Sequence, residues 1–247
     1  MTEERSVPFT VDIDGREFPW APARAGHSSV FQDGFLTYRR YLLDRCLQAS
    51  AFLMRGRVLD VGGRRERVRG AFRPPSEGVV AWRYVNILAD DRPDVVADAC
   101  ELPLSSGSVD CVVCCEVLEH VRKPEQAVAE MYRALKPGGV LIGSTPFLYP
   151  VHADPDDYAR FTASKIRAMC EPFATVRVWP MGGFWGTVGM FLEETVDDGL
   201  RARWHMPVRR VLKAVCRALV ARDLRRQERW TERDVSYTTG YFWICWK

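Results

Sequence analysis

The spacing of apolar and polar positions changes several times along the chain, and each spacing predicts a kind of element. Six short apolar runs are typical of strands: residues 57–61, 79–87, 94–99, 109–117, 140–146 and 174–180. The run VDCVVCCEV at 109–117 is almost wholly apolar, as expected for a central parallel strand buried on both faces. Helical spacing falls between these runs, at 35–54, 124–135 and 162–170. This alternation predicts an open α/β sheet with helices on both faces.

Turn and capping residues support the predicted alternation of strands and helices. Lys136-Pro137-Gly138-Gly139 should end the helix that starts at Pro124, because proline and glycine do not continue a helix. Thr162 is a candidate N-cap for the next helix. Near the start, FTVDI and REFPW flank Asp14-Gly15, a turn pair that favours a tight β-hairpin.

The alternation of strands and helices ends after Pro180. Two long helical stretches, at 185–196 and 207–229, then precede an aromatic strand, SYTTGYFWICWK. We therefore divide the chain into an N-terminal hairpin and cap helix (1–54), a Rossmann-like core (55–180), a helical insertion (181–234) and a final strand (235–247). In the insertion, one stripe carries apolar residues and arginines occupy the other faces; the stripe comprises Val208, Val211, Leu212, Val215 and Leu219. We expect this stripe to pack on the sheet. The alternatives are a lid over the acceptor, a dimer surface, or attachment to an anionic membrane surface or a phosphorylated acceptor.

Composition limits the functional classes. The chain has 247 residues, 47% hydrophobic and 27% charged, with a net charge of +3, which is too small to indicate a nucleic-acid partner. Its eight cysteines are scattered, mostly within apolar runs, as in proteins of a reducing compartment. Cys111 and Cys114 would point to opposite faces of a strand, so we expect no metal site there. The polar N-terminus and the lack of a long apolar run predict a cytoplasmic protein.

Polar residues or glycines follow each of the first five predicted strands, where α/β sheets bind their ligands. In chain order they are Asp60-Val61-Gly62-Gly63, Asn86, Asp98-Ala99, Glu116 and Ser144-Thr145. The carboxyl ends of parallel strands meet at one edge of a sheet, so we expect these residues to line one pocket.

Three stretches in this order carry a resemblance: VLDVGG, then VVADACELPLSSGSVDCVVCCEVLEHV, then EMYRALKPGGVLIGSTPF. Together they resemble the class I S-adenosylmethionine-dependent methyltransferases, most closely their small-molecule branch, over Arg57 to about Trp179. The resemblance implies a Rossmann-like, doubly wound sheet of seven strands whose last strand is antiparallel, which SYTTGYFWICWK would supply, with the helical insertion before it. It implies S-adenosylmethionine as the cofactor.

The resemblance also implies roles for individual residues. Gly62 and Gly63 would let the backbone approach the methionine part of the cofactor, and Asp60 would order that loop or meet the cofactor amino group. Asn86 would bind the ribose hydroxyls. Asp98 would accept from the adenine amino group, and the Ala99 amide would face the ring. Glu116 and Val117 would line the pocket beside the sulfonium, and Tyr38 on the preceding helix is a candidate for the cofactor carboxylate or the acceptor.

Two features of the sequence depart from the family pattern, the glycine loop and the ribose-binding residue. Arg64 and Glu66 replace later glycines of the loop, and an asparagine, Asn86, replaces the usual ribose-binding carboxylate. We expect Arg64 to face outward or to reach the cofactor carboxylate, because a cation at the sulfonium would be repelled. A scaffold protein that keeps the fold without turnover is therefore the alternative function. An NAD-type enzyme is disfavoured, because its loop needs glycines that residues 64–67 lack.

The stretch FLYPVHADPDDYARFT follows the fifth strand and is rich in catalytic residue types. His152 is the candidate base for the acceptor, since its intrinsic pKa lies near neutrality, with Asp156 or Asp157 to orient it. Tyr158 and Arg160 would hold the acceptor, whereas His120 is expected to pack or to cap the next helix. The sequence thus predicts a methyltransferase of a small molecule, most simply O-methylation of a sugar or secondary metabolite. A homodimer is possible, and neither nucleic acid nor firm membrane attachment is expected.

Overall fold

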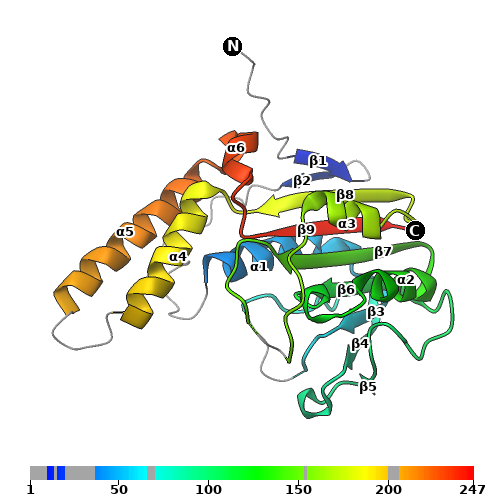
Figure 1. The fold of residues 1–247 in the computed structure, drawn as a ribbon. Coiled ribbons are helices and arrows are strands. Elements are labelled where there is room, and N and C mark those ends of the chain that lie inside the picture. The colour runs from blue at the N-terminus through cyan, green and yellow to red at the C-terminus, as the bar shows by residue number, and fades with distance from the viewer. Residues whose placement is uncertain (1–9, 14–15, 20–36, 66–69, 153–154, 200–205) are drawn as a thin grey trace. The chain divides into compact units, whose positions relative to one another are not determined.

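The computed structural model describes residues 10–13, 16–19, 37–65, 70–152, 155–199 and 206–247 (Figure 1). The chain divides into two compact units. One contains residues 50–179 and 240–247 and holds the large sheet; the other contains residues 1–49 and 180–239. Glu66, part of the predicted cofactor loop, and the Asp14-Gly15 turn lie outside the described residues.

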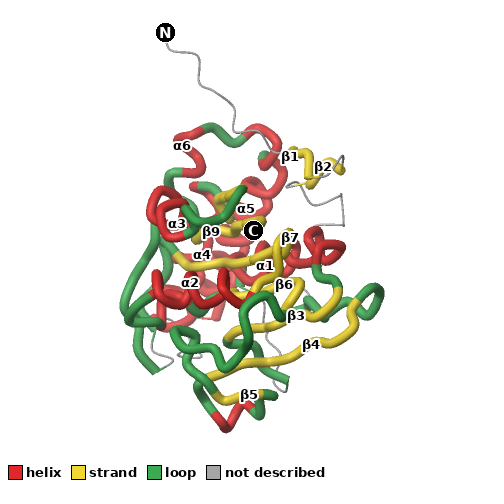
Figure 2. The backbone as a smooth tube through the Cα atoms, turned by 90° about the vertical axis from the view of Figure 1, so that its right-hand side faces the viewer, coloured by secondary structure: helices red, strands yellow, loops and turns green. Residues whose placement is uncertain are grey.

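The large sheet has seven strands in the order β5-β4-β3-β6-β7-β9-β8 (Figure 1). Figure 2 shows β7, β6, β3, β4 and β5 following one another from the middle of the view to the bottom. Their bounds are β3 Gly56–Val61, β4 Val79–Asn86, β5 Val95–Val96, β6 Val109–Cys115, β7 Leu135–Pro146, β8 Thr175–Met181 and β9 Gly240–Trp246. Strands β5, β4, β3, β6 and β7 pair in parallel, and β9 pairs antiparallel with β7. The predicted fold class is confirmed, including the antiparallel last strand.

Strand β6 lies near the middle of the sheet and is buried on both faces, as its sequence predicts. Cys111 and Val112 are fully buried, and Val113 and Cys114 are 4% and 1% exposed. Helices α2 (Pro124–Ala134) and α3 (Ala163–Met169) cover one face of the sheet, and their apolar residues join the same hydrophobic core (Figure 1). Thr162 caps α3 as predicted, since its side chain accepts a hydrogen bond from the Lys165 amide.

The helix that begins at Pro124 ends at Ala134, before the Lys136-Pro137-Gly138-Gly139 segment, as expected. That segment is itself the beginning of β7, because the strand starts at Leu135 and Val109 pairs with this residue. Three 3₁₀ turns connect elements of this unit: η1 (Ala51–Leu53), η2 (Ala89–Asp91) and η3 (Leu118–His120).

The second unit begins with the predicted hairpin of β1 (Thr10–Ile13) and β2 (Arg16–Pro19), whose strands pair antiparallel. It continues with α1 (Tyr38–Ser50) and, after β8, with α4 (Phe184–Gly199), α5 (Met206–Arg225), η5 (Gln227–Arg229) and α6 (Glu232–Val235). Among its described helices, α4 and α5 make the most extensive contact. Across the described residues, no helix combines the length and the apolar character that crossing a membrane requires.

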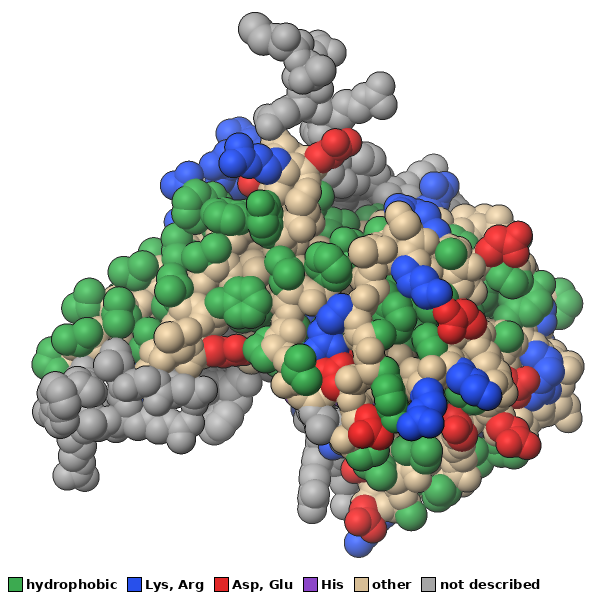
Figure 3. Space-filling model, in the orientation of Figure 1, with side chains coloured by type: hydrophobic (Ala, Val, Ile, Leu, Met, Phe, Trp, Pro, Cys, Tyr) green, Lys and Arg blue, Asp and Glu red, His purple; other side chains and the backbone are tan. Residues whose placement is uncertain are grey.

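The apolar stripe of α5 is not buried, and the expectation that it packs on the sheet is wrong. Four of its residues are exposed, by 38% to 64%: Val208, Val211, Leu212 and Val215. Figure 3 shows hydrophobic side chains gathered along the α4–α5 pair. The buried face of α5 carries instead Cys216, Val220, Asp223 and Leu224. Whether the exposed stripe serves a lid, a dimer or a membrane stays a prediction.

Candidate functional site

A cavity of about 460 Å³ opens at the carboxyl ends of the parallel strands. It is lined by six residues that the sequence assigned to the cofactor pocket, namely Gly62, Asn86, Asp98, Ala99, Glu116 and Val117. They come from the ends of β3, β4, β5 and β6, which the sheet order places side by side. Three other predicted residues, Asp60, Gly63 and Tyr38, are not among the lining residues.

The two glycines after β3 are required by close packing. Gly62 has a φ of 75°, in the left-handed region that favours glycine, and a Cβ there would collide with the Val117 side chain. A Cβ at Gly63 would collide with the carboxylate of Asp60. Asp60 itself is not among the residues that line the cavity, and it accepts a hydrogen bond from Trp82 Nε1 at 3.3 Å. Asp60 was predicted either to order the glycine loop or to meet the cofactor amino group, and this placement favours the first role.

The side chain of Asn86 joins the glycine loop to the segment after β4. Its amide nitrogen lies 3.4 Å from the carbonyl oxygens of Gly62 and Gly63, and its oxygen accepts from the Leu88 amide at 3.0 Å. The same nitrogen donates to Asp91 Oδ2 at 3.2 Å. The side chain thus already holds two segments of the cavity wall, and its contact with a ribose stays a prediction.

Arg64 lines the cavity, so the expectation that it faces outward is not met. Its Nε forms an ion pair with Asp91 Oδ2 at 3.0 Å. This carboxylate balances the charge of the guanidinium, which lowers the repulsion that a cation would exert on a bound sulfonium. The neighbouring Arg65 instead pairs with Asp94 at 2.5 Å and is not a lining residue.

Asp98 and Ala99 form the wall after β5. Asp98 Oδ1 accepts from the Cys100 amide at 2.8 Å, a local turn that fixes the carboxylate at the cavity. Gln126 on α2 donates to the Cys100 carbonyl at 3.1 Å and ties this turn to the helix. The residues expected to recognise adenine therefore lie on a braced segment.

Glu116 is in an unusual conformation for a residue with a side chain, since its φ is 60°. Such a backbone costs about 1–3 kcal/mol and is concentrated at functional sites. Its amide donates to the Ser144 carbonyl at 2.9 Å, and Ser144 Oγ donates to Glu116 Oε1 at 2.6 Å. Both bonds connect β6 to β7 and hold the carboxylate at the cavity wall.

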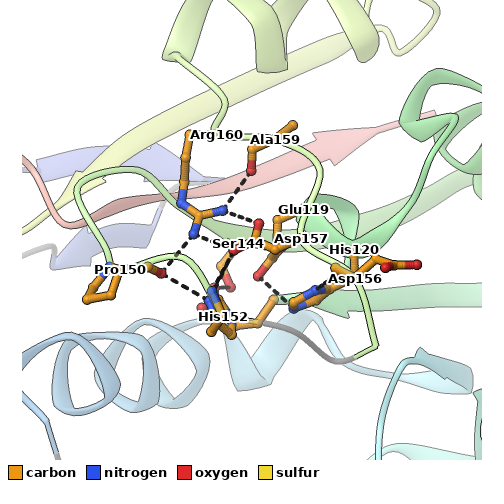
Figure 4. A network of polar contacts seen from close by, with 10 residues as sticks. Glu119, His120, Ser144, Pro150, His152, Asp156, Asp157, Ala159 and Arg160 are labelled. Carbon is orange, nitrogen blue, oxygen red and sulfur yellow. Dashed lines mark hydrogen bonds and ion pairs between the residues drawn. The ribbon is translucent and has the colours of Figure 1, made fainter.

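The histidines lie on two segments beside this cavity. Figure 4 shows His152 next to Pro150 and Asp157, and His120 next to Asp156. The rings of His120 and His152 meet edge to face, with 4.9 Å between their centroids. His120 lines the cavity and His152 is not among its lining residues. The sequence predicted His152 as the base and His120 as a packing or capping residue; which of them acts in catalysis stays a prediction.

Asp157, rather than Asp156, contacts the candidate base. Asp157 Oδ2 accepts from the His152 amide at 2.9 Å and lies 3.4 Å from His152 Nδ1. It also forms a two-pronged ion pair with Arg160, which lowers the pKa of the Asp157 carboxyl to about 2. Burial is the main reason that the pKa of His152 lies below its usual value, so the ring is neutral at physiological pH.

The remaining residues that the sequence assigned to the acceptor either line the cavity or hold the segment beside it in place. Asp156 and Tyr158 line the cavity, and Tyr158 Oη donates to Asp156 Oδ2 at 2.8 Å. Arg160 is not a lining residue, and its guanidinium bonds to Asp157 and to the Pro150 carbonyl at 2.9 Å. Direct contact of Arg160 with an acceptor stays a prediction, and its visible role is to fix this segment.

Tyr38 lies in the other unit. Its hydroxyl donates to Asp223 Oδ2 at 2.5 Å, and its side chain is 3% exposed. Burial, together with the Asp223 carboxylate, raises the pKa of Tyr38. These contacts support a structural role within its own unit, and its predicted contact with the cofactor is untested.

Comparison with known families adds an independent observation. Residues 80–143 match a family model described as a methyltransferase domain. The matched range includes Asn86, Asp98 and Glu116 on the cavity wall, and the sheet around them has the strand order found above. Residues 80–143 of the chain are therefore similar to a methyltransferase domain.

Individual relatives agree with this assignment. A probable S-adenosylmethionine-dependent methyltransferase of Mycolicibacterium smegmatis is 52% identical over 46 residues, which is 19% of this chain and 18% of the relative. A demethylmenaquinone methyltransferase of Clavibacter sepedonicus is 30% identical over 139 residues, 51% of this chain and 52% of the relative. The chain thus spans at most about half the length of such curated relatives.

A solved structure shares the fold of the methyltransferase domain. The S-adenosylmethionine-dependent methyltransferase of Archaeoglobus fulgidus superposes with a TM-score of 0.52 at 18% identity, covering 84% of this chain and 94% of that one. The family cofactor is S-adenosylmethionine, and the wall residues of the methyltransferase domain have the chemistry to hold it: glycine backbone, two carboxylates and an amide.

The sequence did not single out two residues beside the cavity: Asp91 was not considered, and His120 was expected to pack or to cap the next helix. For Arg64, the cavity position agrees with the second of its two predicted alternatives, reach toward the cofactor carboxylate, which stays a prediction. Asp91 lies in a polar loop with no motif around it, so nothing in the sequence distinguishes it. His120 directly follows the β6 end in EVLEHV, and this position was a usable signal.

Proposed function

We propose that the protein is an S-adenosylmethionine-dependent methyltransferase whose acceptor is a hydroxyl of a small molecule such as a sugar or a secondary metabolite. The observation that carries the proposal is the single cavity lined by Gly62, Asn86, Asp98, Ala99 and Glu116. Its volume of about 460 Å³ falls in the range of small-molecule sites. The size of the cavity is what supports a small molecule as the acceptor. The polar side chains beside the cavity, His152 and Asp157 among them, support a hydroxyl as the group that is methylated.

In the proposed complex, Gly62 and Gly63 allow the backbone to approach the methionine part of the cofactor, because no Cβ intervenes. Asp98 accepts from the adenine amino group, and the Ala99 amide faces the ring. Arg64, neutralised by Asp91, stands at the ribose side with Asn86. When bound, S-adenosylmethionine supplies an electrophilic methyl group on sulfur.

The acceptor side uses the chain's own polar groups. His152 takes the proton of the acceptor hydroxyl, and Asp157 and the Pro150 carbonyl orient its ring. Because burial lowers the pKa of His152, its ring is favoured in the neutral form, which has one N–H and one nitrogen that can accept a proton. His120, which lines the cavity, is the second group of this kind within reach.

Calorimetric titration with S-adenosylhomocysteine, S-adenosylmethionine and NAD tests the cofactor. We expect the first two to bind and NAD not to bind. Asp98→Ala should weaken binding by about 10- to 150-fold, the value of one hydrogen bond to a charged group. Asp90→Ala is the control, since Asp90 is exposed on η2 and does not line the cavity. No heat from any of the three would favour the scaffold alternative.

Turnover with a panel of sugars and phenols tests the acceptor class. We expect methyl transfer to at least one hydroxyl compound, monitored by release of S-adenosylhomocysteine. His152→Ala should keep cofactor binding and lower turnover by about 100-fold or more, the usual contribution of a general base. Unchanged turnover in His152→Ala would remove the assigned base without affecting the cofactor assignment.

A further inference from the structure

A glutamate and two histidines meet at the edge of the cavity. Glu119 and His120 belong to η3, directly after β6, and His152 belongs to the loop after β7. One oxygen or nitrogen from each of the three side chains lies within 4.8 Å of the other two. Figure 4 shows these three residues together. Glu119 and His120 come from one segment of the chain and His152 from another.

Both imidazole rings are held through the same nitrogen. His120 Nδ1 lies 2.5 Å from the Asp156 carbonyl oxygen, and His152 Nδ1 lies 3.2 Å from the Pro150 carbonyl oxygen. A carbonyl can only accept, so each neutral ring donates from Nδ1 and keeps its lone pair on Nε2. Histidines that bind metals are held in this way, with one N–H bonded to a backbone carbonyl and the other nitrogen on the metal.

The spacing also suits one ion. In a tetrahedral site with bonds of about 2.0–2.2 Å, neighbouring ligand atoms lie roughly 3.4 Å apart. His120 Nε2 and Glu119 Oε1 are 3.7 Å apart. Two imidazoles on one such ion have ring centroids roughly 5 Å apart, and those of His120 and His152 are separated by 4.9 Å. A small inward movement would complete the site.

The local charge favours a cation. Glu119 is fully buried, and the nearby Asp157 carboxylate is balanced by Arg160. Arg160 also interacts with Glu119 electrostatically, so one guanidinium serves two carboxylates. A buried carboxylate is normally stabilised by donors, a cation or a metal, so a divalent cation beside Glu119 would be favoured electrostatically.

We propose that Glu119, His120 and His152 bind one divalent metal ion, and that the ion is zinc. A ligand set of two histidines and one glutamate is that of catalytic zinc sites, which keep a fourth position for water or a substrate oxygen. His120 also lines the cavity, so this position lies at the acceptor side of the site. The inference goes beyond the proposed function, because the metal can bind whether or not methyl transfer occurs. While His152 Nε2 ligates the ion it cannot take a proton, so the base role proposed for His152 applies to the metal-free protein only.

The sequence did not indicate this site. The only spacing that suggested a metal was the CxxC of Cys111 and Cys114, whose thiols are buried within the sheet. His152 is 32 residues from His120 in the sequence, and no regular ligand spacing connects them. Only the adjacency of the β6 and β7 ends brings them together.

Metal analysis of untagged protein tests the proposal. The protein is stripped with a chelator, equilibrated with zinc chloride, dialysed and measured by plasma mass spectrometry. We expect one zinc per chain, and a visible absorption band of four-coordinate geometry when cobalt chloride replaces zinc. Separate samples with manganese, ferrous and magnesium salts should bind more weakly than zinc. The cobalt spectrum is a readout that needs no activity.

Variants locate the metal. Glu119→Gln, His120→Ala and His152→Ala should each lower zinc affinity by more than about 100-fold, which exceeds the usual effect of an outer-shell partner. Glu125→Gln is the matched control, because Glu125 is exposed and forms an ion pair with Lys165. Circular dichroism of each variant shows that it is folded. His152→Gln provides a second variant with a smaller change in volume.

The outcomes separate this proposal from the proposed function. Wild-type protein that binds no more zinc than Glu119→Gln, or that gives no cobalt band, would overturn the metal site even if S-adenosylhomocysteine binds. Zinc binding that survives in all three variants would also overturn it. Stoichiometric zinc without binding of S-adenosylhomocysteine would leave the metal site standing and contradict the proposed cofactor.

Discussion

Strand β6 and helix α5 both show clear apolar patterns, yet the chain uses them in opposite ways. The apolar residues of β6 are buried, with Cys111 and Val112 fully covered. The apolar stripe of α5 is exposed, with Val211 64% and Val208 55% accessible. Strand β6 has no alternative face, because neighbouring strands and layers enclose it. A helix has several faces, and its periodicity alone does not select the one that is buried.

The buried face of α5 is chosen by polar contacts. Asp223 is 1% exposed, and it accepts hydrogen bonds from the Tyr38 hydroxyl at 2.5 Å and from the Gly183 amide at 3.0 Å. A buried carboxylate is tolerated only where such donors are present. The helix therefore turns toward α1 and the start of α4 with Asp223 inward, and the valine stripe is left outside.

The largest expected effect compares one leucine from each region. Leu141→Ala in β7 should lower the free energy of unfolding by about 2–5 kcal/mol, because the side chain is 1% exposed and its loss leaves a cavity. Leu212→Ala in α5 should change it by less than about 0.5 kcal/mol, because this side chain is 38% exposed. Urea unfolding of both variants measures the difference. Equal losses would show that the α5 stripe is covered in solution.

The second comparison is between two aspartates. Asp157→Asn should cost about 1.5–3 kcal/mol, since it removes the charge that binds Arg160 and the His152 amide. The folded pKa of Asp157 is about 2, below its unfolded value near 3.9. Its stabilisation is present above pH 4 and is lost as the pH falls toward 2.

Wild-type stability should therefore decline over that pH window more steeply than the stability of Asp157→Asn. Asp223→Asn should not share this behaviour, because burial raises the pKa of Asp223 instead. Chemical denaturation from pH 2 to 6 distinguishes Asp157→Asn from Asp223→Asn. Identical dependence of stability on pH in these two variants would contradict the lowered pKa of Asp157.

Tyr38→Phe tests the polar face of α5 directly. Removing the hydroxyl leaves the buried Asp223 without one of its donors, so we expect a loss of about 1–3 kcal/mol. Tyr237→Phe is the control, because Tyr237 is 46% exposed and should change stability by less than about 0.5 kcal/mol. Thermal unfolding measures both. A neutral Tyr38→Phe would mean that Asp223 is held by its backbone donors alone.

The smallest effect concerns the pH dependence of turnover. Because burial lowers the pKa of His152, the acidic limb of the rate profile should lie below the ordinary histidine value of about 6.5. Asp157→Asn should move this limb to still lower pH, since the Asp157 carboxylate favours the protonated ring. An acidic limb above 6.5 would argue against His152 as the titrating group.

Much of the sheet unit could be predicted from the sequence. The strands, the helix at Pro124 and the Thr162 cap follow from local periodicity and capping chemistry, and all are confirmed. The residues proposed to hold the cofactor were recognised because they lie at strand ends, a position that the sequence marks directly, and six of them line the cavity. Asp91 and the placement of Arg64 were not, because their pairing depends on a loop conformation after β4 that no local pattern encodes.

By itself, the sequence determined the α/β class, the order of elements and the residues at the sheet's carboxyl edge, since these depend on neighbours close in the chain. Only the tertiary structure decided that His120 rather than His152 lines the cavity, that Glu119 lies beside both, and that α5 turns its valines outward. Each of these depends on contacts between distant segments, and such contacts are selected by the burial and pairing of polar groups rather than by periodicity.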